Sequence, residues 1–466
     1  MRIPVPEHVL PAAELGTVHF IGIGGAGLSA IARIMAQRGL RVQGSDARDS
    51  DVLASLRAEG IECFVGQNGE HLAGVDTVIA STAVREDNPE ILEAQRAGVR
   101  LWPRSAGLAS LMAPPAVTVA VAGTHGKTTT TAMLTCALQG AGADPSFAIG
   151  AEIPSLGTNA RAGADDIFVV EADESDGAFL HYHPQVALVT NVDADHLDVW
   201  GSVEAYERAF ADFIATVETA VVLVIDDPGA ERLAEVARSA GLRVVTVGLD
   251  TPADVTAHGL RVEGGSTLLT AVVDGVSEPL ELAVPGRHYA QDALLALAAG
   301  SVLGHEPAAL ARGLGAYAGA ARRMEYKGEA GGVRVYDSYA HHPTELVADL
   351  AAARQVADGA RLVAVFQPHL VSRTRIFGSL MGQALSAADE VAVVDIYLAR
   401  EDPDPEVTAQ LVADAVTGVP AHAIGPVGEA ADRLMTLVRP GDVVVTLGAG
   451  DITEVGPRLL ASLESR

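Results

Sequence analysis

Residues 117–130 read VTVAVAGTHGKTTT, an apolar run followed by two glycines, a lysine and a row of threonines. The apolar run has the length of a buried strand, and the threonine-rich segment after it predicts a helix. Glycines let backbone amides point toward an anion, the lysine can neutralise phosphate charge, and a threonine hydroxyl can ligate Mg²⁺. The glycine spacing is shorter than in the usual phosphate loop, so the motif is a variant. It favours nucleotide binding over a plain strand-to-helix turn, by Gly123, Thr124, His125, Gly126, Lys127, Thr128 and Thr129.

Acidic residues follow the next two apolar runs along the chain. The run at 167–170 is followed by EADE at 171–174, and the run at 186–191 is followed by DADH at 193–196. The carboxyl ends of parallel strands face the ligand crevice of an open α/β sheet, and hard oxygen ligands suit Mg²⁺. We therefore favour a metal-ligating acid in the first segment over a solvated turn. For His196, a metal ligand and an ordinary hydrogen-bonding histidine fit equally well.

A second glycine-rich turn lies near the N-terminus. The apolar run that begins at Val18 leads into GIGGAG at 22–27, and Asp46 ends the next predicted strand. This spacing is typical of dinucleotide sites, in which the diphosphate lies at the N-terminus of the following helix. The same geometry holds any diphosphate, so the motif by itself divides evenly between NAD and a UDP-sugar.

The charge of the chain excludes several classes of partner. Sixty acidic residues against 32 basic ones leave a formal net charge of −28 at pH 7, which opposes a broad nucleic-acid or anionic-membrane surface. The two cysteines, Cys63 and Cys136, have no disulfide-framework or metal-site spacing. The first residues lack a signal sequence, and no apolar run reaches the roughly 18 residues of a membrane span. We expect a cytoplasmic protein with no membrane span and no nucleic-acid partner.

The alternation of short Val/Ile-rich runs with helical stretches starts three times in the 466 residues, which predicts parallel sheets with helical crossovers. A break at Pro114 and Pro115 separates the first block from the second. We predict a three-domain α/β protein. It comprises a Rossmann-like domain at 1–114, a P-loop ATPase-like domain with a small antiparallel insertion at 115–321, and a second Rossmann-like domain at 322–466.

Two loops of the third block combine polar and charged side chains. They read DSYAHHPTE at 337–345 and QPHLVSRTR at 367–375, each after a predicted strand. Arg373 or Arg375 could pair with a small carboxylate, while Tyr339 and the neighbouring histidines could orient an amine. Taken singly, each signal favours ordinary surface hydrogen bonding.

Taken in this order, the motifs resemble the Mur ligase family over nearly the whole chain. The most specific pair is GTHGKT with YAHHPTE, and further support comes from GSD at 44–46, PGRH at 285–288, RR at 322–323, SRT at 372–374 and GAGDI at 448–452. The resemblance implies an enzyme that uses ATP and Mg²⁺ to join L-alanine to UDP-N-acetylmuramate through an acyl phosphate, in cell-wall synthesis. The alternative within the family joins the same UDP-sugar to a recycled tripeptide. A dehydrogenase would leave the phosphate loop unused, and a regulatory P-loop protein would leave the third block unused.

The resemblance also implies roles for individual residues in the first two domains. The UDP part of the sugar substrate would bind to Gly22, Gly24, Gly25, Ala26, Gly27, Ser45 and Asp46. ATP would bind to the phosphate loop together with His288 and Arg322. Thr128 and Glu171 would hold one Mg²⁺, and His196 would hold a second.

In the third domain the resemblance places the amine substrate among Tyr339, His341 and Arg373. The catalytic residues would be Lys127, His196, Arg373 and His341, although the base that deprotonates the amine stays open.

Several positions depart from the family pattern. Tyr289 and Asp292 stand where asparagines are usual, which leaves the contacts to adenine open. Ser338 replaces an aspartate before the tyrosine, Leu370 stands where an arginine is common, and Met324 stands where a phenylalanine is common. None of these changes removes the phosphate loop or the implied metal ligands.

Overall fold

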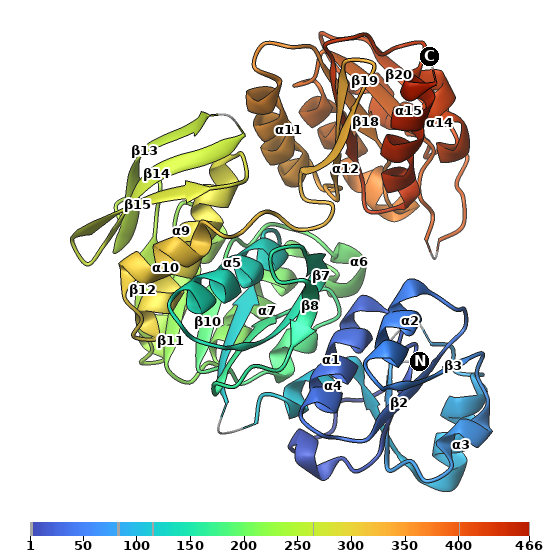
Figure 1. Ribbon diagram of the computed structural model, residues 1–466, viewed down its shortest axis with the longest axis vertical. Helices are drawn as coiled ribbons and strands as arrows, with labels where there is room; N and C mark the ends of the chain where they lie inside the picture. The colour runs from blue at the N-terminus through green and yellow to red at the C-terminus, as the bar shows by residue number, and fades with distance from the viewer. Residues whose placement is uncertain (1–2, 82–83, 114–115, 264, 400, 466) are drawn as a thin grey trace. The chain divides into compact units, whose positions relative to one another are not determined.

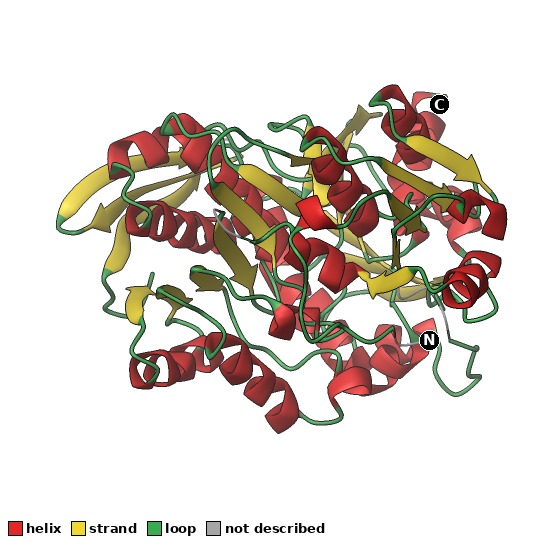
Figure 2. Ribbon diagram, turned by 90° about the horizontal axis from the view of Figure 1, so that it is seen from below, coloured by secondary structure: helices red, strands yellow, loops and turns green. Residues whose placement is uncertain are grey.

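The computed structural model describes residues 3–81, 84–113, 116–263, 265–399 and 401–465. The described residues form three sheets, at 18–103, 117–282 and 325–447 (Figure 1). The predicted three-domain α/β class is thereby confirmed, and both helices and strands occur in every part of the chain (Figure 2). The break at Pro114 and Pro115 lies outside the described residues, and the domain boundaries stay predictions.

The first sheet is parallel and has the order β3-β2-β1-β4-β5. Its strand order reverses at β1, and sheets of this kind bind ligands at the carboxyl ends of the strands at such a point, which is where the GIGGAG turn begins. The strands are β1 (Val18–Ile21), β2 (Val42–Asp46), β3 (Glu62–Val65), β4 (Thr77–Ala80) and β5 (Arg100–Pro103). The helices are α1 (Ala26–Gln37), α2 (Asp51–Ala58), α3 (Pro89–Ala97) and α4 (Arg104–Ser110), with short 3₁₀ turns at Ala12–Glu14 and Gly69–Leu72.

The second sheet has ten strands in the order β15-β14-β13-β12-β11-β10-β6-β9-β7-β8. The strand that carries the phosphate loop, β6, lies between β10 and β9 and is parallel to both. The strands up to β12 are β6 (Val117–Ala122), β7 (Ser146–Ile153), β8 (Thr158–Arg161), β9 (Ile167–Glu171), β10 (Val186–Val189), β11 (Ala220–Val224) and β12 (Arg243–Val247). The helices are α5 (Lys127–Gly140), α6 (Leu197–Trp200), α7 (Val203–Ile214), α8 (Pro228–Ser239), α9 (Arg287–Val302) and α10 (Pro307–Leu314), with a 3₁₀ turn, η3, at Ala178–His181.

The predicted insertion consists of β13 (Val255–Glu263), β14 (Ser266–Val273) and β15 (Val276–Leu282). Only two residues join β14 to β15, and both have positive φ, 49° at Asp274 and 77° at Gly275. This is the backbone of a tight hairpin turn, so the two strands are antiparallel. The insertion continues one edge of the second sheet through the β12–β13 pair.

The third sheet has the order β16-β17-β21-β18-β19-β20, with β16 antiparallel to the parallel remainder. Successive residues of its strands point to opposite cores: Leu362, Ala364 and Phe366 face one, and Val363 and Val365 the other. Helices α11 and α12 cover the first face, and α14 and α15 cover the second (Figure 1). The strands are β16 (Glu325–Ala330), β17 (Val333–Ser338), β18 (Leu362–Phe366), β19 (Glu390–Val394), β20 (Ala421–Gly425) and β21 (Val443–Leu447). The helices are α11 (Pro343–Ala357), α12 (Val371–Leu385), α13 (Ala409–Asp414), α14 (Val427–Leu434) and α15 (Val455–Glu464), with a 3₁₀ turn at Asp451–Glu454.

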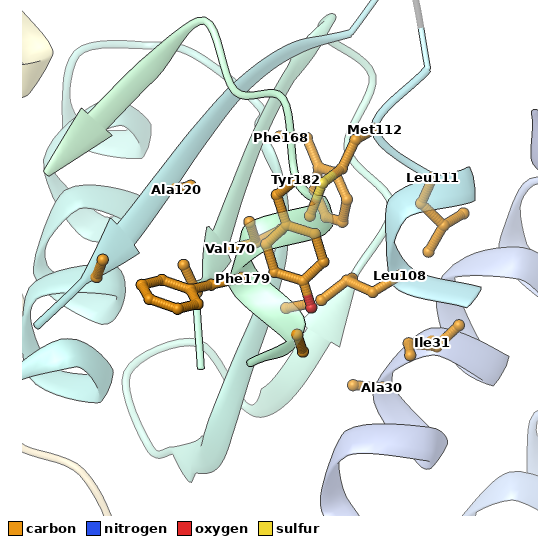
Figure 3. Close-up of a cluster of buried hydrophobic side chains, with 14 of the residues drawn as sticks. Ala30, Ile31, Leu108, Leu111, Met112, Ala120, Phe168, Val170, Phe179 and Tyr182 are labelled. Atoms are coloured by element: carbon orange, nitrogen blue, oxygen red, sulfur yellow. The ribbon is translucent and has the colours of Figure 1, made fainter. Parts of the chain in front are cut away.

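The chain divides into two compact units, residues 1–258, 270–280 and 291–317, and residues 259–269, 281–290 and 318–466. The first sheet and strands β6 to β12 of the second belong to the same unit and share an apolar core. Ala30, Ile31, Leu108, Leu111 and Met112 from the first domain meet Phe168, Val170, Phe179 and Tyr182 from the second (Figure 3). None of the helices in the described part of the chain has the length and apolar character that crossing a bilayer requires.

Candidate active site

The phosphate loop connects β6 to α5 and depends on its two glycines. Gly123 has a φ of 136° and Gly126 a φ of 83°, which side chains rarely permit. A Cβ atom on Gly123 would lie 1.9 Å from Oγ1 of Thr190, and one on Gly126 would lie 2.8 Å from Oδ1 of Asp292. The loop therefore needs glycine at both positions for conformation and for space.

The end of β10 holds the loop in place. Oγ1 of Thr190 and Nδ2 of Asn191 donate to the carbonyl oxygen of His125, at 2.5 and 3.1 Å. The amide of His125 donates to Oδ1 of Asn191 at 2.9 Å. Oγ1 of Thr124 lies 2.8 Å from the hydroxyl of Tyr206. The polar residues predicted at this edge of the sheet therefore fix the loop backbone.

Lys127 folds back over the loop and pairs with Glu174. Its Nζ donates to the carbonyl oxygens of Gly123 and Thr124, at 2.6 and 2.9 Å, and lies 2.7 Å from Oε2 of Glu174. Burial raises the pKa of Glu174 to about 7, although Lys127 acts in the opposite direction. Burial disfavours the ammonium of Lys127, but Glu174 and then Asp173 outweigh it and raise its pKa. The sequence pointed to the EADE segment but did not single out Glu174 as the partner of Lys127.

The implied Mg²⁺ ligands lie at the carboxyl ends of neighbouring strands. Glu171 ends β9 opposite Val121 of β6, and its Oε1 accepts a hydrogen bond from the amide of Gly150 at 2.7 Å. Thr128 lies in the first turn of α5. Hydroxyl and carboxylate oxygens are donors that suit Mg²⁺, so the chemistry of this pair fits the ion.

His196 lies beside two acids. It has a φ of 51°, and its Nε2 lies 3.8 Å from Oε1 of Glu174 and 3.7 Å from Oδ2 of Asp195. The imidazole therefore faces the same carboxylate as Lys127. Its role as a metal ligand stays a prediction.

The glycine turn of the first domain is braced by the end of β2. The amide of Gly24 donates to Oδ2 of Asp46 at 3.0 Å, and the amides of Gly22 and Ile23 donate to the carbonyl oxygen of Ser45. Oγ of Ser45 is buried and donates to Oε2 of Glu90 at 2.5 Å. Asp46 and Ser45 thus shape the turn, while Gly25 and Ala26 at the start of α1 are exposed.

The three residues predicted for the amine site lie along one row in the third domain. The ring of Tyr339 meets that of His341 at 5.4 Å, and His341 meets His369 at 5.8 Å. Nδ1 of His369 lies 3.4 Å from Nη1 of Arg373. His369, which was only part of a weak loop signal, connects the two motifs. Its ring also stacks on Tyr397, which lines a cavity of about 360 Å³ together with Gln367, Asp395 and Asp451.

The arginine pair predicted from the sequence also contacts this row. The guanidinium groups of Arg322 and Arg323 lie 5.0 and 5.4 Å from the ring centroid of Tyr339. Arg322 donates through Nη2 to the carbonyl oxygen of Gly448 and pairs through Nε with Asp337 at 3.3 Å. These contacts connect GAGDI with YAHHP inside one domain.

A carboxylate lies next to the serine that replaces the usual aspartate. Oγ of Ser338 donates to Oδ2 of Asp349 in α11 and accepts from the amide of Ala340 at 3.0 Å. Nε2 of His288 lies 3.7 Å from Oδ1 of Asp349. Burial raises the pKa of Asp349 to about 6, while burial and then Arg323 lower that of His288 to about 4. Helix α11 therefore supplies a carboxylate, that of Asp349, beside the position where the family usually has an aspartate.

The other departures are buried inside the protein. Tyr289 is 2% exposed, and its hydroxyl donates to the carbonyl oxygen of Arg323 at 3.0 Å. Met324 is also buried and has a φ of 49°. Leu370 has a φ of 66° and is the N-cap residue of α12, two positions before the SRT segment. These residues support the loops around the row.

Asp349→Asn is expected to remove the loss of stability that the ionisation of Asp349 causes as the pH rises from 4 to 6. An unfolded aspartate has a pKa near 3.9, and the folded pKa of Asp349 is raised by burial to about 6. The unfolded state ionises first as pH rises, so the contribution of Asp349 to the free energy of unfolding falls over this range, by roughly 1–3 kcal/mol. Asparagine has no charge to bury. Thermal unfolding of both proteins at several pH values measures the effect.

The matched control is Asp358→Asn, which changes an exposed acid at the end of the same helix. It should shift the stability of the protein by the same small amount at every pH. If Asp349→Asn instead gave a pH-independent difference from the wild type, the buried carboxyl would not titrate as inferred.

Three family models match successive parts of the chain. The Mur ligase family catalytic domain matches residues 17–114, the Mur ligase middle domain matches 121–300, and the Mur ligase glutamate ligase domain matches 322–450.

Relatives that match over the full length of the chain are ligases of one kind. The chain is 58% identical over 469 residues to UDP-N-acetylmuramate--L-alanine ligase of Nocardioides sp., with all of both sequences covered. It is 48% identical over 473 residues to the protein of the same name from Thermobifida fusca, covering 99% of this chain and all of the relative.

Solved structures share the fold. UDP-N-acetylmuramate-alanine ligase from Thermotoga maritima matches with a TM-score of 0.80 and 29% identity, covering 96% of this chain and 99% of that one. A murein peptide ligase from Psychrobacter arcticus matches with a TM-score of 0.71 and 24% identity, covering 97% and 99%. The latter likeness concerns the fold alone.

Proposed function

Because the chain belongs to the Mur ligase family, we propose that it joins L-alanine to the lactyl carboxylate of UDP-N-acetylmuramate while ATP is converted to ADP and phosphate. The observation that carries this proposal is the 58% identity, over the full length, to a protein of that name. The phosphate loop and its strand-end acids supply the chemistry that the reaction needs.

The reaction begins at the phosphate loop. An oxygen of the substrate carboxylate attacks the γ-phosphorus of ATP, and the bond from this phosphorus to the oxygen that bridges to the β-phosphate breaks. ADP departs, and the substrate carboxylate has become an acyl phosphate. Lys127 lies at the start of α5 among loop carbonyls, where its ammonium can exchange Glu174 for the ATP phosphates. Thr128 and Glu171 would hold one Mg²⁺ and His196 a second, and these ions would offset phosphate charge when bound.

The second step forms the amide bond. The uncharged amine of L-alanine attacks the acyl carbonyl, the nitrogen loses a proton to a base, and phosphate leaves as the tetrahedral intermediate collapses. Tyr339, His341 and Arg373 are the residues we assign to the amine substrate, with Arg373 suited to its carboxylate. His341 is the candidate catalytic residue here, and its Nδ1 lies 3.2 Å from Oε2 of Glu345.

The remaining assignments follow the same logic. We assign the uridine diphosphate to the turn formed by Gly22, Gly24, Gly25, Ala26 and Gly27, braced by Ser45 and Asp46. We assign His288 and Arg322 to ATP alongside the phosphate loop. The two free cysteines are consistent with the cytoplasmic location expected from the sequence.

The test is phosphate release from Mg-ATP in the presence of UDP-N-acetylmuramate, with L-alanine, with the tripeptide L-alanyl-γ-D-glutamyl-meso-diaminopimelate, or with no amine. We expect release that depends on L-alanine and a product whose mass equals the UDP-sugar plus alanine minus water. Release only with the tripeptide would assign the chain to peptide recycling. No release with either amine would contradict both assignments.

A further inference from the structure

Arg104 extends along the glycine turn of the first domain. It is the first residue of α4 and directly follows β5. A Cβ atom on Gly27 would lie 3.1 Å from Cδ and 3.2 Å from Nη1 of Arg104. The guanidinium therefore lies beside the first turn of α1, where the proposed diphosphate site begins, and the glycine at 27 leaves room for it.

The other edge of the same guanidinium faces the second domain. Nη2 of Arg104 lies 3.0 Å from Oδ2 of Asp173 and 3.4 Å from Oδ2 of Asp176. The second oxygen of each aspartate is occupied locally, because Oδ1 of Asp173 accepts from the amide of Ser175 and Oδ1 of Asp176 accepts from the amide of Ala178. Each acid thus has one fixed oxygen and one that faces Arg104.

Two cations, Arg104 and Lys127, stabilise the charged form of Asp173. Burial would raise its pKa, but Arg104 and then Lys127 outweigh burial and hold it well below the usual range. Lys127 in turn pairs with Glu174, the next residue in the chain. A row of alternating charges, Arg104, Asp173, Lys127 and Glu174, therefore runs from the glycine turn of the first domain to the phosphate loop of the second.

The scaffold beneath this row is apolar and shared by the two domains. Leu108 in α4 and Leu111 just after it belong to the same buried cluster as Phe179 in η3 and Tyr182 just after it (Figure 3). The helix that carries Arg104 and the segment that carries its acidic partners are thus packed together. A change in the contacts of Arg104 can therefore affect Lys127 while the apolar core keeps its packing.

We propose that Arg104 couples the two nucleotide sites, by binding the diphosphate of the UDP-sugar through Nη1 while Nη2 stays on Asp173. The inference rests on the proposed function, because it needs a diphosphate at the glycine turn. A planar guanidinium can donate to two anions at once in a fixed geometry, which a lysine ammonium cannot reproduce.

The expected sign of the coupling is positive. Glu174, which contacts Lys127, and Asp173, which attracts it at longer range, both compete with the ATP phosphates for its ammonium. A diphosphate that holds Arg104 in place keeps the guanidinium charge of Arg104 next to Asp173. Asp173 then attracts Lys127 less, and the ammonium of Lys127 is available to the ATP phosphates. By reciprocity, bound ATP must raise the affinity for the UDP-sugar by the same factor.

The experiment measures that factor by calorimetry on the full chain. The affinity for a non-hydrolysable ATP analogue with Mg²⁺ is determined with and without UDP-N-acetylmuramate. For the wild type we expect the UDP-sugar to raise it by about 5-fold or more, the lower end of typical coupling factors. Arg104→Lys should bring the coupling factor close to one. It should also lower the affinity for the UDP-sugar in the absence of the ATP analogue.

Two further variants separate coupling from structure. Asp173→Asn/Asp176→Asn frees Arg104, so it should retain affinity for the UDP-sugar and lose the coupling. Arg100→Ala is the matched control, because Arg100 lies four residues earlier and bonds within the first domain to Oγ1 of Thr77. It should keep the wild-type factor.

The outcomes are distinct. A wild type that binds both ligands without mutual effect overturns the inference, as does an Arg104→Lys protein that is folded and keeps the full factor. A wild type that binds no UDP-N-acetylmuramate contradicts the proposed function itself, and the inference falls with it.

Discussion

Lys127→Ala is expected to lower the rate of amine-dependent phosphate release by at least about a hundredfold. The side chain begins α5, and its Nζ lies against the carbonyl oxygens of Gly123 and Thr124. From that position it can offset the charge that spreads over the transferring phosphoryl group. Steady-state phosphate release at saturating substrates, compared with the wild type, measures the effect.

The same substitution is expected to destabilise the fold for a separate reason. The side chain of Glu174 is 1% exposed, and its Oε2 lies 2.7 Å from Lys127 Nζ. Removing one partner of a buried ion pair costs about 3–5 kcal/mol. Because burial raises the pKa of Glu174 to about 7, the carboxyl can take up a proton and reduce this cost.

The double variant Lys127→Ala/Glu174→Gln is the control. It removes both members of the Lys127–Glu174 pair, so it should recover most of the unfolding midpoint lost in Lys127→Ala while remaining inactive. Turnover close to that of the wild type in the double variant would mean that Lys127 only neutralises Glu174, and the assignment of the phosphate loop would then be wrong.

Gly123→Ala is expected to abolish ATP binding and to cost at least about 3 kcal/mol of unfolding free energy. The added methyl group would stand 1.9 Å from Oγ1 of Thr190 and 3.1 Å from its backbone nitrogen. Relief requires the loop to move away from β10, which breaks the hydrogen bonds that hold His125. Chemical unfolding and titration with an ATP analogue measure the two effects.

Gly142→Ala is the matched control. Gly142 also has a positive φ, 86°, but its added methyl group would meet nothing within 4 Å. We expect a loss of about 1–2 kcal/mol from the backbone conformation alone and unchanged ATP binding. If both variants lost the same amount, contact with Thr190 would not be the reason that position 123 requires glycine.

The phosphate loop could be predicted because its signal is local. A strand of six residues, two glycines and a lysine are adjacent in sequence, and their conformation follows from neighbouring residues alone. The positive φ values at Gly123 and Gly126 fit that prediction. The strand-end acids were also predictable, since Glu171 follows an apolar run and β9 pairs with β6.

The partners of these residues could not be predicted. Arg104 is 69 residues from Asp173, and the sequence around it reads as an ordinary helix start. Asp349 lies in the middle of α11, where an isolated acid would be taken for a surface residue. Only the packing of α11 against the end of β17 places its carboxylate on Ser338.

The sequence by itself determined the class of protein, its three α/β domains and the loops to which we assign the chemistry, because strand rhythm, glycine turns and strand-end charges are short-range properties. The tertiary structure decided which charges neutralise one another: Lys127 with Glu174, and Arg104 with Asp173 and Asp176. Such pairs depend on burial and on distances of a few ångströms between segments remote in the chain. Neither quantity is set until the sheets and helices have packed.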